Sequence, residues 1–558
     1  MNPRPKQPNV LLVVMDDMAF GDLACHGNPH TSTPHLDALH AESVRLTRYG
    51  SGPLCTPARA ALMTGRHPYR TRAIDTYCGR SIIDPDERTL PQVLGDAGYT
   101  CGLFGKWHLG DNLPSRPHDL GFHETLHHAG GGLNQPANLG RDSYFDADLI
   151  RNGTLEPSRG YCTDVFTDGA LAFIDRHQDA PWLCYLATNA PHSPFAVPEQ
   201  YAEPYRQAGL PEVWARLYGM VTNIDANVGR LLKRLDERGL ADNTLVIFTS
   251  DHGPCPSATL DGQIRFNASL RGLKGTMYEG GIRVPCFWRW PDTLPAGHDV
   301  DRLANPIDLL PTLAGFCSAQ VPDDRAIDGA DLGALLTGAT RPEAWPDREI
   351  CMQWHRGDLP QTGRNAATLG QRYKWYWPEH ADQAELYDLE QDPTEQRDLA
   401  DQLPDRAAAM RATYEAWFAD VSHTRGETPE ENYAPPPILI GDARENPSVL
   451  TRQDMRLYDT TPEGWGDQHP GYWWVNVTRP GLYCLTVDLP PHAGPATLTL
   501  RCGGWSKDVA LTTGCLTVGC DNVALPTGDQ RLEALLVDAH GDRLAVKYLR
   551  VARLATVS

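Results

Sequence analysis

The sequence that first indicates the fold is Asn9–Asp17, NVLLVVMDD, in which an unbroken apolar run precedes two aspartates. Such a run, without alternation of apolar and polar side chains, is typical of a strand buried on both faces of a sheet. Side chains that follow a buried strand lie at the carboxyl edge of the sheet, where α/β proteins bind their ligands. Asp16 and Asp17 are therefore candidate ligands of a cation; the alternative is a turn that caps the next helix.

Outward from this strand, strand-like and helix-like segments alternate up to about residue 340. Helical spacing predicts helices at Thr33–Leu46, Thr89–Ala97, Thr163–His177 and Tyr218–Arg238. Short apolar runs predict strands at Thr100–Phe104, Trp182–Ala187 and Thr244–Thr249. This alternation predicts an α/β domain over residues 1–345, with a mostly parallel sheet flanked by helices. Asp251 and His252 follow the last predicted strand and are expected at the same edge of the sheet as the aspartate pair.

The chain changes character after residue 345. Short aromatic strands and one helix predict a small α+β subdomain with an antiparallel sheet over residues 346–422. Residues 423–447 are polar and rich in proline, which predicts a linker. Short strands separated by turn residues predict an appended all-β sandwich over residues 448–558. Its aromatic run Tyr472–Trp474 alternates across a strand, so at least one of these side chains packs in a core; stacking on a sugar is the alternative.

Composition limits the class of function. The 558 residues include 50 basic and 71 acidic side chains, giving a net charge of −21, and 41% are hydrophobic. This charge excludes binding to nucleic acid or to an anionic membrane as the main activity, but it allows an anionic substrate in a locally basic pocket. The sequence has neither an apolar run of about 18 residues that would span a membrane nor a signal-peptide pattern. We expect a cytoplasmic protein, or a periplasmic or secreted one if a leader has been removed.

Fourteen cysteines without a CxxC pair predict buried thiols rather than disulfides or a zinc ribbon, with one exception. Cys55 lies in Pro53–Arg70, PLCTPARAALMTGRHPYR, where Pro57 and the alanines after it predict a helix that begins beside the thiol. The free amides and the dipole of a helix N-terminus bind anions and lower the pKa of a thiol. Arg59, four residues on, adds positive charge, so the segment is a candidate oxyanion site; the alternative is an ordinary buried cysteine.

Cys55, Pro57 and Arg59, followed by a helix and by Thr64-Gly65-Arg66, resemble the signature of the sulfatase family of the alkaline phosphatase superfamily. Segments that resemble other parts of this family occur in the family's order: Asn9–Asp17, Thr33–Leu39, Gly105–Gly110 (GKWHLG), Ala190–Phe195 (APHSPF), Ser250–Gly253 (SDHG), Lys274–Pro285 (KGTMYEGGIRVP) and Leu386–Ala400. The resemblance covers about residues 8–422 and implies an alkaline-phosphatase-like fold. It leaves the residues after 422 without an assignment.

The resemblance implies that a maturation enzyme oxidises Cys55 to formylglycine, an aldehyde. One hydroxyl of the hydrated aldehyde, ionised on a metal, would attack the sulfur of a sulfate ester and form a covalent sulfo-enzyme. The other would then eject sulfate and restore the aldehyde, an exit that serine lacks. The implied metal site comprises Asp16, Asp17, Cys55, Asp251 and His252, and its oxygen ligands favour Ca²⁺, with Mg²⁺ or Mn²⁺ as alternatives. His252 has a second interpretation, beside the metal and bonded to the nucleophile.

The resemblance also implies roles for charged groups around the nucleophile. Arg59, Lys106 and Lys274 would stabilise the sulfate oxygens. His108 would deprotonate the hydrated aldehyde for sulfate release, while His192 and Lys274 would contact sulfate and help protonate the leaving oxygen. Taken without the resemblance, Lys106 and Lys274 are ordinary surface lysines and His192 is a turn residue.

These features predict a sulfatase that acts on a sulfated carbohydrate or an aryl sulfate and has a maturation enzyme as a partner, with oligomerisation left open. A phosphonate monoester or phosphodiester hydrolase of the same superfamily is the alternative, but such relatives generally lack the Lys-x-His that Lys106 and His108 form here. A non-catalytic sugar-binding protein is a second alternative; it predicts a missing nucleophile or metal ligand, and none is missing. The pair His127–His128 is expected in a loop near the site.

Overall fold

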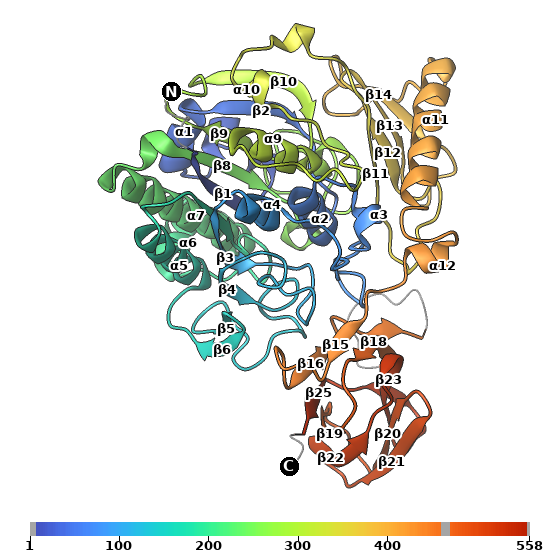
Figure 1. The fold of residues 1–558 in the computed structure, drawn as a ribbon. Helices are drawn as coiled ribbons and strands as arrows, with labels where there is room; N and C mark the ends of the chain where they lie inside the picture. The colour runs from blue at the N-terminus through green and yellow to red at the C-terminus, as the bar shows by residue number, and fades with distance from the viewer. Residues whose placement is uncertain (1–6, 459–468, 555–558) are drawn as a thin grey trace.

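The computed structural model describes residues 7–458 and 469–554 (Figure 1). The ends of the predicted domains at 1–6 and 555–558, and residues 459–468, lie outside the described residues. The N-terminal region is built on a ten-stranded sheet with the order β10-β2-β9-β8-β1-β7-β3-β4-β5-β6. Its strands are β1 (Asn9–Met15), β2 (Val44–Tyr49), β3 (Thr100–Lys106), β4 (Glu124–His128), β5 (Asp148–Arg151), β6 (Thr154–Pro157), β7 (Trp182–Ala187), β8 (Thr244–Ser250), β9 (Cys286–Arg289) and β10 (His298–Ala304).

The centre of this sheet is parallel. Strands β8, β1, β7, β3 and β4 all run in one direction, and β10 runs parallel to β2. Strand β9 is antiparallel to both of its neighbours, β2 and β8, and β5 and β6 form an antiparallel edge beyond β4. The sheet is therefore mixed, and its parallel centre carries the edge at which the predicted metal ligands meet.

Helices cover both faces of the ten-stranded sheet (Figure 1). One face packs against α1 (Pro34–Ala41), α5 (Cys162–Arg176), α6 (Glu199–Gln207) and α7 (Glu212–Glu237). The other packs against α2 (Cys55–Thr64), α4 (Leu90–Asp96) and α9 (Leu309–Phe316). Leu11 and Val13 of β1 point into the first core, and Val10 and Leu12 into the second. Burial on both faces explains why the run that opens the sequence is apolar throughout.

Short helical turns connect these elements. The described residues include α3 (Pro68–Thr71), α8 (Glu279–Ile282), α10 (Gly333–Leu336) and the 3-10 turns η1 (Phe20–Asp22), η2 (Ala24–His26), η3 (Ala241–Asn243), η4 (Pro256–Ala258), η5 (Pro306–Asp308) and η6 (Pro342–Ala344). Several of them lie in the long loops that follow the carboxyl ends of the central strands, which is where the predicted site residues are found.

The predicted helix Thr33–Leu46 is wrong in its second half. Helix α1 ends at Ala41, and β2 begins at Val44. Val44 fits the helical spacing of the leucines before it, but it also begins an alternation in which Leu46 is buried and Arg45 between them is less so. That two-residue period is the pattern of a strand, and it overrides the helical spacing.

The pair His127–His128 was also placed wrongly, in a loop. Both residues end β4, and His128 lies opposite Lys106 of β3 in the parallel pairing. Both side chains are buried, and the ring of His128 packs near that of Phe166 on α5. Polar residues hid this strand in the sequence, because the apolar pattern that marks a buried strand is missing at its end.

A small subdomain follows the large sheet. Its antiparallel sheet has the order β11-β12-β13-β14, and α11 packs against one face (Figure 1). The elements are β11 (Ile350–Gln353), β12 (Ala366–Leu369), β13 (Tyr373–Trp377), β14 (Glu385–Asp388) and α11 (Pro404–Val421). On the opposite face, Met352 and Tyr376 share a core with Leu54 and Ala61 of the large domain. This core lies directly beside the start of α2.

The C-terminal residues form two sheets of a β-sandwich (Figure 1). The larger sheet contains β15 (Ile438–Ile440), β17 (Arg456–Leu457), β18 (Gly471–Val477), β20 (Ala496–Cys502), β21 (Trp505–Leu511), β23 (Gly528–Val537) and β24 (Arg543–Ala545). The smaller contains β16 (Ser448–Thr451), β19 (Leu482–Asp488), β22 (Thr517–Ala524) and β25 (Tyr548–Arg553). Trp473 is buried between the sheets, while Tyr472 and Trp474 are partly exposed, as the alternation predicted.

The stretch predicted as a linker, residues 423–447, is partly regular. It contains α12 (Pro429–Asn432) and the strand β15, which pairs in parallel with β18 of the sandwich. Arg425 donates hydrogen bonds to Asp86 and Glu87 of the large domain. Prolines before β15 suggested a free linker, but they do not prevent the apolar triplet after them from joining a sheet at its edge.

Two further findings bear on the sequence predictions. All fourteen cysteines are free, and most are buried, as the absence of paired spacing indicated. Among residues 7–458 and 469–554, no helix combines the length and the apolar content needed to cross a bilayer.

Candidate active site

The predicted metal ligands meet at the carboxyl edge of the parallel sheet. Strands β1 and β8 are neighbours, with Met15 opposite Ser250, so the residues that follow each strand are adjacent. The amide of Asp251 donates to the carbonyl of Met15 at 3.1 Å, which ties the two strand ends together. Asp16, Asp251 and His252 are all fully buried or nearly so. The geometry therefore brings together four of the predicted ligands from two chain segments that lie far apart in sequence.

Cys55 is the first residue of α2 and points into this group of ligands. Its Sγ lies 3.1 Å from Nε2 of His252 and 3.5 Å from Oδ1 of Asp16. Helix α2 is buried along its whole length and ends at Gly65, whose φ of 68° is the left-handed conformation that favours glycine. The predicted position of the thiol at a helix N-terminus is confirmed.

Two lysines decide the charge state of the site. Nζ of Lys106 lies 2.7 Å from Oδ2 of Asp16, and Nζ of Lys274 lies 2.7 Å from Oδ1 of Asp17. Burial raises the pKa of Cys55, but the two ammonium groups outweigh it and lower the pKa to about 5, so the group is a thiolate at neutral pH. Lys106 is completely buried, which excludes the interpretation of this residue as a solvated surface lysine.

The same cations keep the aspartates ionised. Burial alone would raise the pKa of Asp16, but Lys106 and the neighbouring cations hold that pKa well below its usual value. For Asp17, Lys274 and His192 outweigh burial and lower the pKa to about 2. Ionised carboxylates at a strand edge are ligands that a hard divalent cation prefers.

The donor set fits a cation. Oδ2 of Asp17 is buried and accepts no hydrogen bond from the described residues. Ligand atoms of Asp16, Cys55, Asp251 and His252 lie within 4.8 Å of one another. Burial lowers the pKa of His252, but Asp251 and the Cys55 thiolate raise it to about 9, so a cation bound here would compete with a proton for this imidazole. His252 contacts the nucleophile and lies among the metal ligands, so both sequence interpretations remain open.

Arg59 differs from the two lysines. Its Nη2 and Nε donate to Oδ2 of Asp251 at 2.8 and 3.1 Å, and its Nη1 donates to the hydroxyl of Tyr185 at 3.2 Å. The side chain is 1% exposed. All three guanidinium nitrogens thus donate to protein atoms, and Arg59 holds the Asp251 carboxylate in place; this geometry does not support direct contact with a sulfate oxygen.

The two predicted histidines occupy opposite sides of the nucleophile. His108 is buried with φ of 60°, and its Nε2 lies 2.8 Å from the carbonyl of Thr76. A carbonyl only accepts, so Nε2 carries the proton, and Nδ1, which is buried without a partner among the described residues, has the free lone pair. Burial and Lys106 hold the pKa of His108 well below its usual value, so the ring is neutral at pH 7.

His192 and Lys274 form the open side of the site. Nδ1 of His192 lies 2.6 Å from the carbonyl of Ser193, and its Nε2 lies 3.7 Å from Oδ2 of Asp17. The side chains of His192 and Lys274 are each 13% exposed, whereas those of Lys106 and Asp16 are not exposed at all. A substrate therefore reaches the nucleophile from the side of His192 and Lys274.

Sequence reasoning missed several supporting residues. Thr56 donates through its hydroxyl to the carbonyl of His108 at 3.0 Å, and Tyr185 supports Arg59. The carbonyl of Thr76 orients His108, and no side-chain pattern could have indicated that role. Thr56 lies within the Cys-x-Pro-x-Arg segment, and its place directly after the nucleophile was the one available signal.

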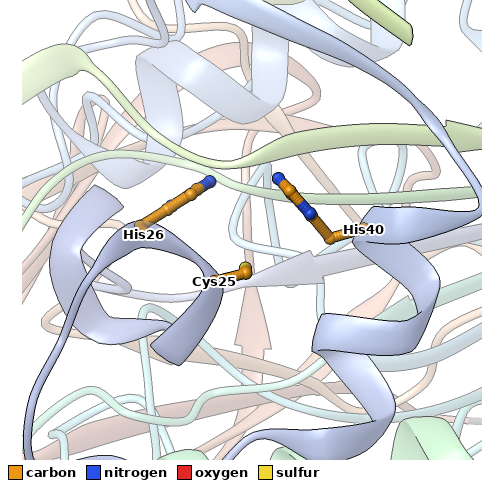
Figure 2. Close-up of side chains that lie close together, drawn as sticks. All are labelled: Cys25, His26 and His40. Carbon is orange, nitrogen blue, oxygen red and sulfur yellow. The ribbon is translucent and has the colours of Figure 1, made fainter. Parts of the chain in front are cut away.

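A second group of ligand-type side chains, Cys25, His26 and His40, lies away from this edge. Figure 2 shows the three side chains directed toward one another, with ligand atoms within 4.8 Å. Nη1 of Arg45 lies 3.5 Å from Nδ1 of His40, and burial together with Asp37 raises the pKa of Cys25 to about 12. A neutral thiol beside a guanidinium is a poor cation site, so this group packs as a neutral cluster.

A nucleophile at a helix N-terminus, oxygen ligands for a cation and two lysines that favour an anion define a hydrolase of oxyanion esters on an alkaline-phosphatase-like fold. The Sulfatase family model matches residues 8–318, and the model described as "N-sulphoglucosamine sulphohydrolase, C-terminal" matches residues 273–415. The chain belongs to the sulfatase family and is a sulfuric ester hydrolase.

Known proteins agree with this assignment. The chain is 33% identical over 395 residues to N-acetylgalactosamine-6-sulfatase of Canis lupus familiaris, covering 67% of this chain and 72% of the relative. It is 35% identical over 364 residues to human arylsulfatase A, covering 60% and 68%. The crystal structure of Ps i-CgsB in complex with k-i-k-neocarrahexaose superposes with a TM-score of 0.68 and 27% identity, over 75% of this chain and 95% of that one.

The same fold extends to other hydrolases. A phosphonate monoester hydrolase of Agrobacterium radiobacter superposes with a TM-score of 0.53 and 23% identity, over 74% of this chain and 95% of that one. At this identity the likeness concerns the fold alone. Both family models end before the sandwich, so residues 416–558 lie outside them.

Proposed function

We propose that the protein hydrolyses the sulfate ester of a sulfated carbohydrate or of an aryl sulfate, with formylglycine formed from Cys55 as nucleophile and one divalent cation, Ca²⁺ first. The observation that carries the proposal is the convergence of the ligands Asp16, Asp17 and Asp251 on Cys55, with two lysines around them. The names of the relatives, among them N-acetylgalactosamine-6-sulfatase and arylsulfatase A, support both substrate classes.

The cation would be held by Asp16, Asp17, Asp251 and His252, which offer mostly oxygen ligands. When bound, it supplies Lewis acidity and stabilises the negative charge of an oxygen nucleophile. Hydrated formylglycine at position 55 supplies two hydroxyls on one carbon, one to attack and one to expel sulfate. Arg59 keeps the Asp251 carboxylate directed at the cation position through two hydrogen bonds.

The chain's own cations and histidines would carry the proton and charge transfers. Lys106 and Lys274 neutralise the sulfate oxygens as charge shifts during transfer. His192, on the open side, protonates the leaving oxygen of the alcohol together with Lys274. His108 accepts a proton at Nδ1 in the step that releases sulfate, because this nitrogen is unprotonated and has no other partner among the described residues.

Mass spectrometry of the peptide that carries residue 55 tests the nucleophile. We expect an aldehyde at position 55 in active enzyme and a Cys55→Ser variant with at least about a thousandfold lower kcat/KM. Full activity with an unmodified thiol would disprove the mechanism. Chain preparations made without the maturation enzyme are the matched control, since they hold the same sequence with the thiol.

Paired substrates test the reaction. An aryl sulfate and the corresponding aryl phosphonate ester, assayed on one preparation, separate the two members of the superfamily, and we expect the sulfate to be preferred. A strong preference for the phosphonate ester would favour the phosphonate monoester hydrolase, with which the chain shares its fold. A panel of sulfated sugars then divides carbohydrate from aryl substrates.

A further inference from the structure

One loop of the sandwich reaches the active site. It connects β16 to β17, and its residue Gln453 is 1% exposed. The loop is fixed from both sides: the amide of Gly79 in the large domain donates to the carbonyl of Gln453 at 2.8 Å, and Nε1 of Trp473 in the sandwich donates to the carbonyl of Thr451 at 2.7 Å. The aromatic run singled out in the sequence thus anchors this loop.

The carboxamide of Gln453 makes two hydrogen bonds to the large domain. Its Nε2 donates to the carbonyl of Thr76 at 2.8 Å and to the hydroxyl of Ser81 at 2.6 Å. The Thr76 carbonyl is also the acceptor for Nε2 of His108, at 2.8 Å. A carbonyl has two lone pairs, so one oxygen serves both donors. Gln453 and His108 are therefore joined through a single atom.

The shared carbonyl lies in an irregular segment. Thr76 belongs to the turns between α3 and α4, where hydrogen bonds of regular secondary structure do not set the orientation of the peptide. Its amide is held by Oδ1 of Asp75 at 2.7 Å, and its carbonyl is held by Gln453. The direction in which this carbonyl points fixes which imidazole nitrogen of His108 keeps the proton.

We propose that Gln453, supplied by the appended sandwich, is a positioning residue for His108. By holding the Thr76 carbonyl, it keeps the proton on Nε2 and leaves Nδ1 as the proton acceptor that faces the reacting groups. The inference rests on the proposed function, in which His108 acts in sulfate release. It also makes the sandwich a part of the active site, although this region lies outside the family models.

A purely structural role makes a different prediction. If Gln453 only fastened the sandwich, its loss would lower stability and would leave the kinetic steps of folded enzyme unchanged. If it positions His108, its loss slows sulfate release while substrate binding and the first bond cleavage are preserved. The two roles are therefore separated by measuring the two products of an aryl sulfate independently.

The test compares Gln453→Met and Gln453→Glu, which keep the length of the side chain and remove the amide donor. We expect kcat to fall by about 10- to 100-fold, with KM within about twofold of the parent. In the first turnover we expect the phenol to be released as fast as in the parent, so that a burst of phenol precedes the slower release of sulfate. Ser81→Ala, which frees the carboxamide on one side, should give a smaller change of the same kind.

Tyr548→Phe is the matched control. It removes another hydrogen bond from the sandwich to the large domain, from the Tyr548 hydroxyl to the carbonyl of Asn138 at 3.0 Å, and leaves Thr76 and His108 untouched. We expect parental kcat and no burst. An unchanged kcat in folded Gln453→Met would overturn the inference, as would an equal loss in Tyr548→Phe.

Two outcomes must be kept apart. If the parent enzyme hydrolyses no sulfate ester at all, the proposed function fails, whatever the variants do. If the parent is active and the Gln453 variants show no burst, the proposed function stands and the positioning role is wrong. Should both Gln453 variants fail to fold, unchanged product kinetics in Ser81→Ala would overturn the inference, and a burst there would support it.

Discussion

Two groups of buried carboxyl groups in this protein are in opposite charge states. At the edge of the large sheet, the pKa values of Asp16 and Asp17 are held low, that of Asp17 at about 2. At the seam between the large domain and the sandwich, burial raises the pKa of Asp111 to about 6, that of Glu445 to about 7 and that of Asp454 well above its usual value. We call the second group the seam carboxyls.

Depth of burial does not distinguish the two groups; the number of cations within reach does. Lys106 and Lys274 lie at 2.7 Å from the site aspartates. The nearest guanidinium of the seam, on Arg116, is 4.0 Å from Glu445, and Asp111 accepts only from the amide of Gly130. A carboxyl without a close cation stays protonated when buried. The site is thus prepared for charge, whereas the seam is neutral.

Removal of the cation tests the first half of the comparison and should have the largest effect. Since Asp16 and Asp17 are ionised to hold a divalent ion, we expect dialysis against a chelator to lower kcat/KM by about a thousandfold or more. Ca²⁺ should restore it best. As a second readout, Ca²⁺ should raise the melting temperature of the parent and fail to do so in Asp17→Asn. Full activity after removal of all metal would contradict this view of the site.

Lys106→Met removes a cation from the site and leaves Asp16 buried without its partner. We expect kcat to fall by about 10²- to 10³-fold and the free energy of unfolding to fall by about 3–5 kcal/mol, because an uncompensated buried charge remains. Kinetics and thermal unfolding measure both. Lys233→Met, at a lysine whose side chain is 77% exposed, is the control and should change neither quantity. Parental activity in Lys106→Met would mean that this charge does not act on the reaction.

The seam carboxyls should make stability fall as the pH rises. The pKa of Glu445 is about 7 in the folded chain against an ordinary value of 4.5. Between these values the folded state keeps a proton that the unfolded state releases, so the free energy of unfolding decreases from about pH 4.5 to about pH 7 and the penalty is constant above that. We expect Glu445→Gln to be more stable than the parent by about 1–3 kcal/mol at pH 8 and by much less at pH 5.

Thermal unfolding of Glu445→Gln at these two pH values measures the difference. Glu430→Gln, at an exposed residue on α12, is the control and should show no such dependence. A stabilisation of Glu445→Gln that is equal at pH 5 and pH 8 would show that Glu445 is ionised in the seam, and the contrast with the site would then be lost.

The sequence predicted the site far better than the seam, for a physical reason. Asp16, Cys55 and Asp251 each follow a strand or begin a helix, so short local patterns predict where they meet. Thr76 and Gln453 are 377 residues apart, and their hydrogen bond joins a side chain to a backbone carbonyl. Such a contact leaves no periodicity and no spacing in the sequence, so only the folded chain reveals it.

The same reason explains the errors in the fold. Val44 satisfied a helical and a strand period at once, and only its neighbours in the sheet decided between them. His127 and His128 are buried polar residues at a strand end, which hydrophobic patterning does not find. The central strand β1 was predictable because both of its faces are buried, and this leaves one unambiguous signal.

A last, small effect would sharpen the comparison. The Tyr548 hydroxyl donates to the carbonyl of Asn138 across the seam at 3.0 Å, and neither atom carries a charge. Tyr548→Phe should therefore lower the free energy of unfolding by about 1 kcal/mol, equally at pH 5 and pH 8, and equally at low and high salt. Glu445→Gln changes stability with pH, and Lys106→Met changes a charged pair, so only the tyrosine variant isolates a neutral contact. If its effect varied with pH in step with that of Glu445→Gln, the seam would be one coupled network, and the neutral hydrogen bonds could not be separated from the carboxyls that surround them.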